Sequence, residues 1–373
     1  MRAFSRFCVT ALCYSALSLF SFAQQVAPQV QPATPGKAEA APATVANHTI
    51  SLDVVVTDKA GNPVPGLQQQ DFTLLDDKQP KKIISFRARA EADHASDPIQ
   101  AILLVDAVNS AAQGVGYQQE QLQKFFRRDG GHLPIPTSLL VFTDTSTQVQ
   151  PQPTQDGNVL AAALNANQPG LRAIGRSGGF YGAADRLQLS LQALQEIIQY
   201  EAKQPGRKLL IWLSPGWPLL SGPEVELTNK EQEAIFREIV ALCQQLREAR
   251  ITLYAVDPLG TADAGSFRTF YYQTFLKGVT SSKKVDNGDL ALQVLAVQSG
   301  GRALNSSNDV SSLIATCLAD SKAYYSISFE SPPADHPNEY HALVIKVDKP
   351  GLTARTRAGY YAQPYADRPV SKP

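Results

Sequence analysis

The sequence predicts an α/β protein in which a mainly parallel sheet, covered by helices on both faces, is inserted into a small antiparallel β-domain. In the middle of the chain, continuous apolar runs alternate with segments whose apolar residues recur every three or four positions. These are the patterns of buried parallel strands and amphipathic helices. Both ends of the chain show short strand-like runs separated by turns. Because neither end is long enough to close a β-sandwich alone, we expect the two ends to pair with one another.

The first 23 residues have the pattern of a secretory signal peptide. Arg2 and Arg6 form a basic start, an apolar run covers residues 7–20, and small side chains at Ser21 and Ala23 suit cleavage after Ala23. The apolar run is shorter than the ~20 residues that a membrane-spanning helix needs. We therefore expect an exported protein, periplasmic or secreted, with no transmembrane segment in the mature chain.

Charge excludes a nucleic-acid-binding protein that works through a basic surface. Of the 373 residues, 34 are Lys or Arg and 34 are Asp or Glu, and removal of residues 1–23 leaves 32 basic against 34 acidic side chains. A slightly acidic mature chain does not favour contact with a polyanion.

Residues 24–48 are rich in Ala, Pro and Gln and predict a flexible linker, because they hold too little apolar surface to fold. Beyond it we expect the β-domain in two pieces, residues 49–92 and 322–362. Between them lies the α/β domain, residues 95–321, and residues 363–373 form a tail. The predicted strands of the α/β domain are residues 99–105, 138–142, 208–213 and 251–256. The predicted helices carry Leu187, Leu191, Leu194 and Ile198, and Ile235, Ile239, Leu242 and Leu246.

Two cysteines, Cys243 and Cys317, remain after removal of the signal peptide, each on the apolar stripe of a predicted helix. Free cysteines commonly pack in cores. Sequence cannot show whether the two approach within bridging distance, so a disulfide between them stays open.

An apolar strand that ends in Asp106, followed by a hydroxyl at Ser110, resembles the first metal-site loop of von Willebrand factor A domains. Residues 140–144 and 208–216 are similar to the second and fourth strands of that fold. The flanks, with Asp71-Phe72, Asp76-Asp77, Tyr340-His341 and Arg357-Ala358-Gly359-Tyr360, resemble the exported VWFA-related proteins described from acidobacteria. The resemblance covers residues 49–362. It implies a doubly wound sheet with a divalent cation, Mg²⁺ or another, at the carboxyl edge.

Carried over by position, the family's metal site is incomplete in this chain. Asp106 and Ser110 match two ligands, whereas Val108 replaces a serine and cannot ligate. Ser214-Pro215-Gly216 replaces the family's Thr-Asp-Gly, so the second carboxylate is missing. The resemblance therefore implies a degenerate metal-ion-dependent adhesion site (MIDAS). The alternative is that Asp106 and Ser110 cap the following loop and helix by hydrogen bonds.

The same rim supplies the candidate partner-binding residues Asn109, Ser214 and Trp217, with Phe270 and Tyr271 in the long insertion over residues 259–287. Long insertions at the ligand edge of a sheet often carry recognition, and aromatic side chains make strong anchors. The alternative is that these aromatic residues pack onto the edge of the sheet.

The sequence contains no His-Glu-x-x-His motif and no Walker-type phosphate loop. The segment Gly175-Arg176-Ser177-Gly178-Gly179 has the spacing Gly-x-Ser-x-Gly, but it does not follow a predicted strand, as the nucleophile turn of a hydrolase must, and we expect it to be a flexible loop. We therefore expect a non-enzymatic, exported module that recognises a protein partner at the carboxyl rim of the sheet. The alternatives are a structural envelope protein that binds through its β-domain, and a hydrolase with an unrecognised site.

Overall fold

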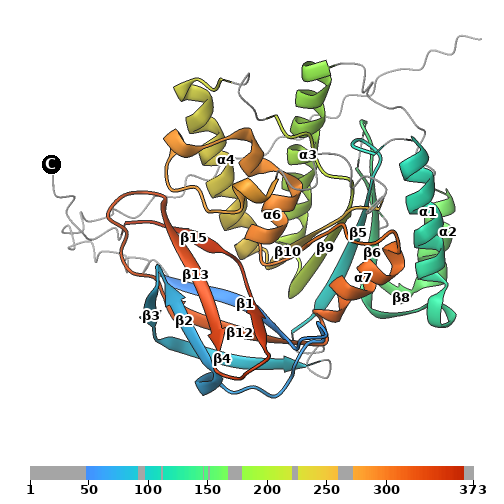
Figure 1. The fold of residues 1–373 in the computed structure, drawn as a ribbon. Coiled ribbons are helices and arrows are strands. Elements are labelled where there is room, and N and C mark those ends of the chain that lie inside the picture. Colours follow the sequence, from blue (N-terminus) through green and yellow to red (C-terminus); the bar gives the residue numbers. More distant parts are fainter. Residues whose placement is uncertain are drawn as a thin grey trace, which may run out of the picture. The chain divides into compact units, whose positions relative to one another are not determined.

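The computed structural model describes residues 48–90, 97–110, 112–145, 147–149, 152–166, 179–220, 226–258 and 272–364 (Figure 1). The predicted signal peptide, almost all of the predicted linker and most of the predicted tail lie outside these residues, as do Phe270 and Tyr271. None of the described helices combines the length and the apolar character that a membrane span requires.

The chain has an α/β fold built on a mixed sheet of seven strands, with the order β11-β10-β9-β5-β6-β7 and with β8 also paired to β6. Five strands run parallel, and the short β7 and β8 run antiparallel to β6. The strands are β5 (Ile99–Asp106), β6 (His132–Phe142), β7 (Thr147–Val149), β8 (Thr154–Asp156), β9 (Arg207–Leu213), β10 (Ile251–Val256) and β11 (Ala303–Leu304).

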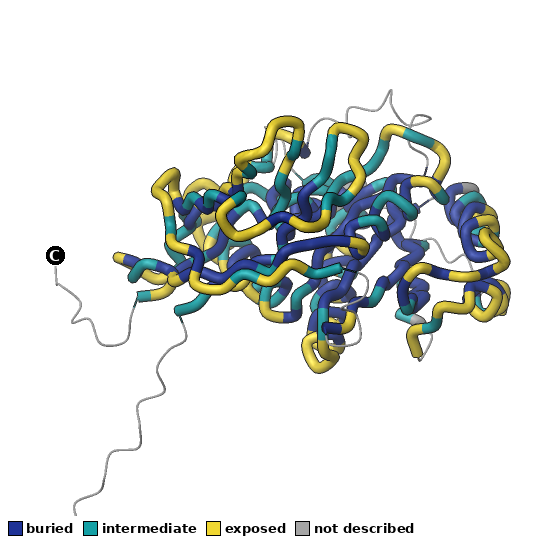
Figure 2. Tube along the Cα trace, turned by 90° about the horizontal axis from the view of Figure 1, so that it is seen from below, coloured by how far each residue is buried: buried dark blue, intermediate teal, exposed yellow. Residues whose placement is uncertain are grey.

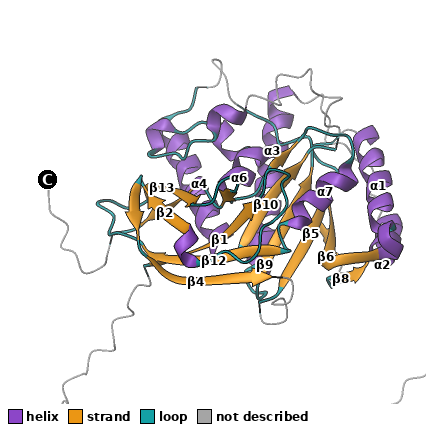
Figure 3. Cartoon of the chain, turned by 60° about the horizontal axis from the view of Figure 1, so that its bottom comes forward, coloured by secondary structure: helices purple, strands orange, loops and turns teal. Residues whose placement is uncertain are grey.

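Helices cover both faces of this sheet. Successive side chains of β5 point to opposite faces, so that the strand contributes to an apolar cluster on each side. Ile102 and Leu104 pack in an apolar cluster with α3, α4 and α6, whereas Leu103 and Val105 pack in a second cluster with α1, α2 and α7 (Figures 1 and 3). The helices are α1 (Ala112–Phe126), α2 (Gly157–Ala166), α3 (Gly179–Glu201), α4 (Asn229–Glu248), α6 (Leu292–Gln298) and α7 (Val310–Ala319).

The two helices predicted from apolar spacing are α3 and α4. The start of α4 is set by a capping box, in which the Thr228 hydroxyl accepts a hydrogen bond from the Glu231 amide and the Glu231 carboxylate accepts one from the Thr228 amide. Short 3-10 turns connect other elements: η1 (Gln69–Asp71), η3 (Arg128–Gly131), η6 (Tyr272–Phe275), η7 (Ser282–Lys284) and η8 (Asn287–Leu290).

Cys243 and Cys317 are both free, so the disulfide left open by the sequence does not form. Cys243 lies on α4 and Cys317 on α7. These helices pack in the clusters on opposite faces of the sheet, and the sheet separates the two thiols.

The direction of strand addition reverses at β5. From β5 the chain adds β6 and β7 on one side, and then returns to add β9, β10 and β11 on the other. In open α/β sheets such a reversal leaves a crevice at the carboxyl ends of the two strands that flank it, here β5 and β9.

Strands from both ends of the described chain pair into two antiparallel sheets of four strands, β14-β1-β12-β4 and β15-β13-β2-β3. Leu52 of β1 lies opposite Ile327 of β12, and Leu74 of β2 lies opposite Ile345 of β13. These side chains share one apolar cluster. The strands are β1 (Thr49–Thr57), β2 (Phe72–Asp76), β3 (Gln79–Lys81), β4 (Ile83–Ala90), β12 (Ala323–Glu330), β13 (Glu339–Val347), β14 (Thr353–Arg355) and β15 (Gly359–Ala362).

Polar contacts join the first of these sheets to the amino ends of the central strands. The Tyr324 hydroxyl of β12 donates at 2.9 Å to Oδ2 of Asp97, which lies just before β5. Arg250, which lies just before β10, donates to Asp53 of β1 at 3.1 Å. Buried residues run along the strands, while exposed residues gather in the turns and on the outer sides of the helices (Figure 2).

Candidate functional site

Asp106 ends β5 beside the point where strand addition reverses, and its side chain is fully buried. Its Oδ1 accepts hydrogen bonds from the backbone amides of Val108 at 3.0 Å and Asn109 at 2.8 Å. Its Oδ2 accepts from Asn109 Nδ2 and from Trp212 Nε1, both at 2.9 Å. The loop after β5 is therefore wound around this one carboxylate.

The hydrogen bonds to Asp106 leave it poorly suited to a cation. Burial raises the pKa of Asp106, and the hydrogen bonds from Asn109 and Trp212 act against that effect. A carboxylate has about four acceptor positions, and four donors already occupy them. A divalent ion would have to displace several of these donors and would find no second carboxylate in the loop. The geometry does not fit a bound Mg²⁺ here and favours the loop-capping alternative.

The residues around Asp106 serve the interior of the fold. Val108 packs in the apolar cluster with α3. Asn109 Nδ2 also donates to Ser190 Oγ of α3 at 2.9 Å, and the Ser110 hydroxyl accepts from Gln118 Nε2 of α1 at 2.8 Å. The two predicted metal ligands thus have different neighbours: Asp106 holds its own loop, and Ser110 fastens that loop to α1.

The described partner-binding candidates are also buried. The exposed fractions are 5% for Asn109, 1% for Ser214 and 3% for Trp217. The Ser214 hydroxyl accepts from the Gly216 amide at 3.2 Å, and the Trp217 ring packs edge-on against Trp212 with centroids 5.1 Å apart. In this conformation these side chains shape the rim from inside and offer little surface to a partner.

Among the described residues, Tyr181 at the start of α3 offers an exposed aromatic side chain on this rim. Since α3 leads to the amino end of β9, its own start lies at the carboxyl edge of the sheet. Tyr181 is 81% exposed, whereas Tyr200 near the other end of the same helix is 53% exposed. Sequence analysis did not single out Tyr181 because a helical pattern alone does not say which end of a sheet a helix start will meet.

A group able to hold a cation lies elsewhere in the described residues, in the sheet that contains β2 and β13. His341 Nδ1 is 3.0 Å from Asp76 Oδ1 and 3.1 Å from Asp77 Oδ2. The hydrogen bond to Asp76 raises the pKa of His341, and the Tyr360 hydroxyl donates to Asp76 Oδ2 at 3.1 Å. The same spacing suits a protonated histidine between two carboxylates, so geometry alone does not require a metal.

Sequence analysis missed this group because its members lie 265 positions apart. In the sequence, Asp76-Asp77 and Tyr340-His341 stand only as two separate motifs near opposite ends of the chain. A cavity lined by five arginines at the opposite, amino edge of the central sheet was also not predicted. Only pairing of the two ends of the chain brings either set together.

No protein-family model matches the sequence, and no curated protein matches it. Among solved structures, the pilus adhesin SpaC from Lactobacillus rhamnosus GG is similar at 10% identity and a TM-score of 0.36, over 80% of this chain and 43% of that one. A mutant of the PilB minor pilin from Streptococcus sanguinis shows 11% identity and a TM-score of 0.30, over 60% and 62% of the two chains. The human COPII-coat protein Sec24c shows 9% identity and a TM-score of 0.29, over 72% of this chain and 44% of that one. This chain thus spans less than two thirds of each of these chains, and similarities this distant define neither its family nor its function.

Proposed function

We propose that the protein is an exported, non-enzymatic binding module that recognises a protein partner at the carboxyl rim of its central sheet. In this proposal, residues 95–321 form a doubly wound domain of the von Willebrand A type, inserted into a β-domain made of residues 49–92 and 322–362. The strand order supports it, with the antiparallel β7 at one edge, β5 in the centre and the reversal between β6 and β9. Resemblance to the VWFA-related family rests on the sequence motifs alone and remains part of the proposal.

The observation that carries the proposal is the loop after β5. It lies where such folds place ligands, and four hydrogen bonds to Asp106 hold it in shape without a metal. Recognition at this rim is therefore metal-independent. Asp106, Asn109 and Trp217 set the shape of the rim, and the exposed Tyr181 supplies an aromatic contact for the partner.

The test is a pull-down from envelope extract with the mature chain, followed by measurement of the dissociation constant with the purified partner. Tyr181→Ala should weaken binding about tenfold or more, as loss of an aromatic anchor does. Tyr200→Ala is the matched control, because Tyr200 is an exposed tyrosine near the other end of the same helix, and it should bind like wild type. Binding should persist in EDTA.

The alternatives give different results in the same experiment. A structural envelope protein that binds through its β-domain would keep its partner in the Tyr181→Ala variant. Loss of binding in EDTA would contradict the metal-independent rim. If no partner is recovered from the extract, the result favours the alternative of a hydrolase with an unrecognised site.

A further inference from the structure

A cavity of about 450 Å³ lies where the first antiparallel sheet meets the amino edge of the central sheet. It is bordered by β1, β4 and β12 on one side and by the end of α4 and the start of β10 on the other. This is the edge opposite to the carboxyl rim. Its volume falls in the range of small-molecule sites.

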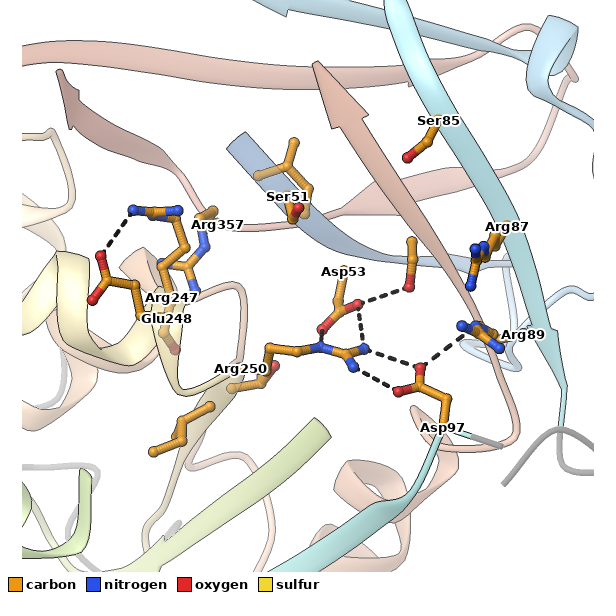
Figure 4. A pocket seen from close by; sticks show the side chains of 15 residues that line it. Ser51, Asp53, Ser85, Arg87, Arg89, Asp97, Arg247, Glu248, Arg250 and Arg357 are labelled. Atoms are coloured by element: carbon orange, nitrogen blue, oxygen red, sulfur yellow. Dashed lines mark hydrogen bonds and ion pairs between the residues drawn. The ribbon is translucent and has the colours of Figure 1, made fainter. Parts of the chain in front are cut away.

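The lining is rich in arginine, with five guanidinium groups against three carboxylates. Figure 4 shows Arg87 and Arg89 on one side and Arg247 and Arg357 on the other, with Arg250 between them. The carboxylates belong to Asp53, Asp97 and Glu248. Full ionisation leaves an excess of two positive charges.

Two of the three carboxylates are already engaged by Arg250. Its Nη1 donates to Asp97 Oδ1 at 2.7 Å, and its Nη2 donates to Asp53 Oδ1 at 3.1 Å. Burial acts to raise the pKa of Asp97, but the hydrogen bond and the charge of Arg250 outweigh it, and the pKa lies below its usual value. Arg89 Nε adds a contact at 3.5 Å from Asp97 Oδ2. These pairs join the two sheets and neutralise Asp53 and Asp97.

The charges left over belong to Arg87, Arg247 and Arg357. Arg357 is only 7% exposed, and its guanidinium donates to the backbone carbonyl of Cys243 at 3.4 Å. No carboxylate of the described residues lies within ion-pair distance of it. Burial lowers the pKa of Arg357 and the charge of Arg247 adds to this effect, whereas Cys243 and the charge of Asp53 act in the opposite direction without outweighing it. A buried cation that has no carboxylate in direct contact is unfavourable unless another group supplies the counter-charge.

Neither of the other two arginines has a strong partner. Arg247 contacts Glu248 at 3.4 Å, but the Glu248 side chain is 54% exposed, and exposed pairs of this kind contribute little. Arg87 is exposed and makes no ion pair with the described residues. The cavity therefore presents three guanidinium groups that are able to accept an anionic guest.

We propose that this cavity is a binding site for a small organic dianion whose charge lies on oxygen, of the phosphate-monoester or dicarboxylate type. Two negative charges match the excess of the lining. Arginine forks pair with both carboxylate and phosphate oxygens, and the hydroxyls of Ser51 and Ser85 border the same space. The anion would supply the counter-charge that Arg357 lacks. This site is separate from the carboxyl rim and does not depend on the function proposed there.

The test is thermal unfolding of the full mature chain in rising concentrations of inorganic phosphate or succinate, each compared with NaCl at equal ionic strength. At about 100 times its dissociation constant, a specific anion should raise Tm by roughly 4 °C for a folded unit of this size. Isothermal titration calorimetry then gives the dissociation constants. Binding of either probe above the NaCl background supports the site and shows which oxyanion it prefers, and binding of neither overturns it.

Variants locate the effect. Arg357→Gln should unfold at the same or a higher temperature than wild type without anion, since it removes an uncompensated buried charge, and its Tm should no longer respond to phosphate or succinate. Arg87→Gln alters an exposed residue that the fold does not need, and should weaken anion binding about fivefold or more. Arg128→Gln is the control, because Arg128 is an exposed arginine outside the cavity. An equal response to the anion in all three variants and wild type would overturn the proposal, even if Arg357→Gln proved unstable.

Discussion

Replacement of Asp106 distinguishes two roles for its carboxylate, the capping of the loop after β5 and the binding of a metal ion. The side chain is fully buried and accepts four hydrogen bonds, two from backbone amides and two from side chains. Asp106→Ala leaves all four donors unpaired. Asp106→Asn keeps an oxygen for the amides of Val108 and Asn109, but turns an NH₂ group toward Asn109 Nδ2 and Trp212 Nε1.

The magnitudes follow from the number of donors left without a partner. Each buried donor that loses its acceptor costs about 1–3 kcal/mol. Relief of the carboxylate's own desolvation offsets part of this loss. We therefore expect Asp106→Ala to lower the free energy of unfolding by about 4 kcal/mol, and Asp106→Asn by about 2 kcal/mol, because only two of its four hydrogen bonds fail.

Urea denaturation measures both values, provided that the dependence of the free energy of unfolding on urea concentration has the same slope in the variants as in wild type. Asp185→Ala serves as the control, since Asp185 is an exposed acid on α3, and it should change stability by no more than ~0.5 kcal/mol. A loss below ~1 kcal/mol for Asp106→Ala would refute the loop-capping argument. A rise in Tm on addition of millimolar Mg²⁺ or Mn²⁺ that disappears in Asp106→Asn would refute it as well, and would restore the metal site.

Three further predictions concern other parts of the molecule. Limited proteolysis should release a stable fragment of about residues 95–321, and a stable fragment of residues 49–92 alone would contradict the pairing of β1 and β4 with β12. Burial raises the pKa of Asp289 to about 6 from 3.8, so the stability that this group contributes is fully present below about pH 4 and is lost as the pH rises through 6. Stability curves should show a fall of up to ~3 kcal/mol over that window, which Asp289→Asn should abolish. Burial also raises the thiol pKa of Cys243 and Cys317, so both should resist a disulfide reagent in the native protein and react in guanidinium chloride, and rapid native reaction of either would contradict the packing described for them.

Local patterns in the sequence were sufficient for most regular elements. The apolar runs at residues 99–105, 208–213 and 251–256 became β5, β9 and β10, because strands covered on both faces carry apolar side chains at nearly every position. The three-residue strands β7 and β8 had no such signal. They exist because the edge of β6 offers backbone groups to pair with, which a sequence pattern does not record.

The candidate sites depended more on tertiary structure. That Asp106 lies at the carboxyl end of a central strand followed from the sequence. That Trp212 and Asn109 would occupy its second oxygen did not, since Trp212 comes from a strand 106 positions away. The burial of Ser214 and Trp217 was also not predictable from the sequence. A rim loop can face solvent or fold back on the sheet, and its tertiary packing decides which.

By itself, the sequence determined the class of fold and the place where the strand that carries Asp106 ends, since both depend on the spacing of apolar residues along a short stretch of chain. The tertiary structure alone decided which charged groups meet. The five arginines of the cavity come from β4, α4, the residue before β10 and the segment before β15, and His341 meets Asp76 across a strand pair. Charged side chains leave no periodic signal when their partners are distant in sequence, because their positions are set by sheets that form only after both ends of the chain have paired.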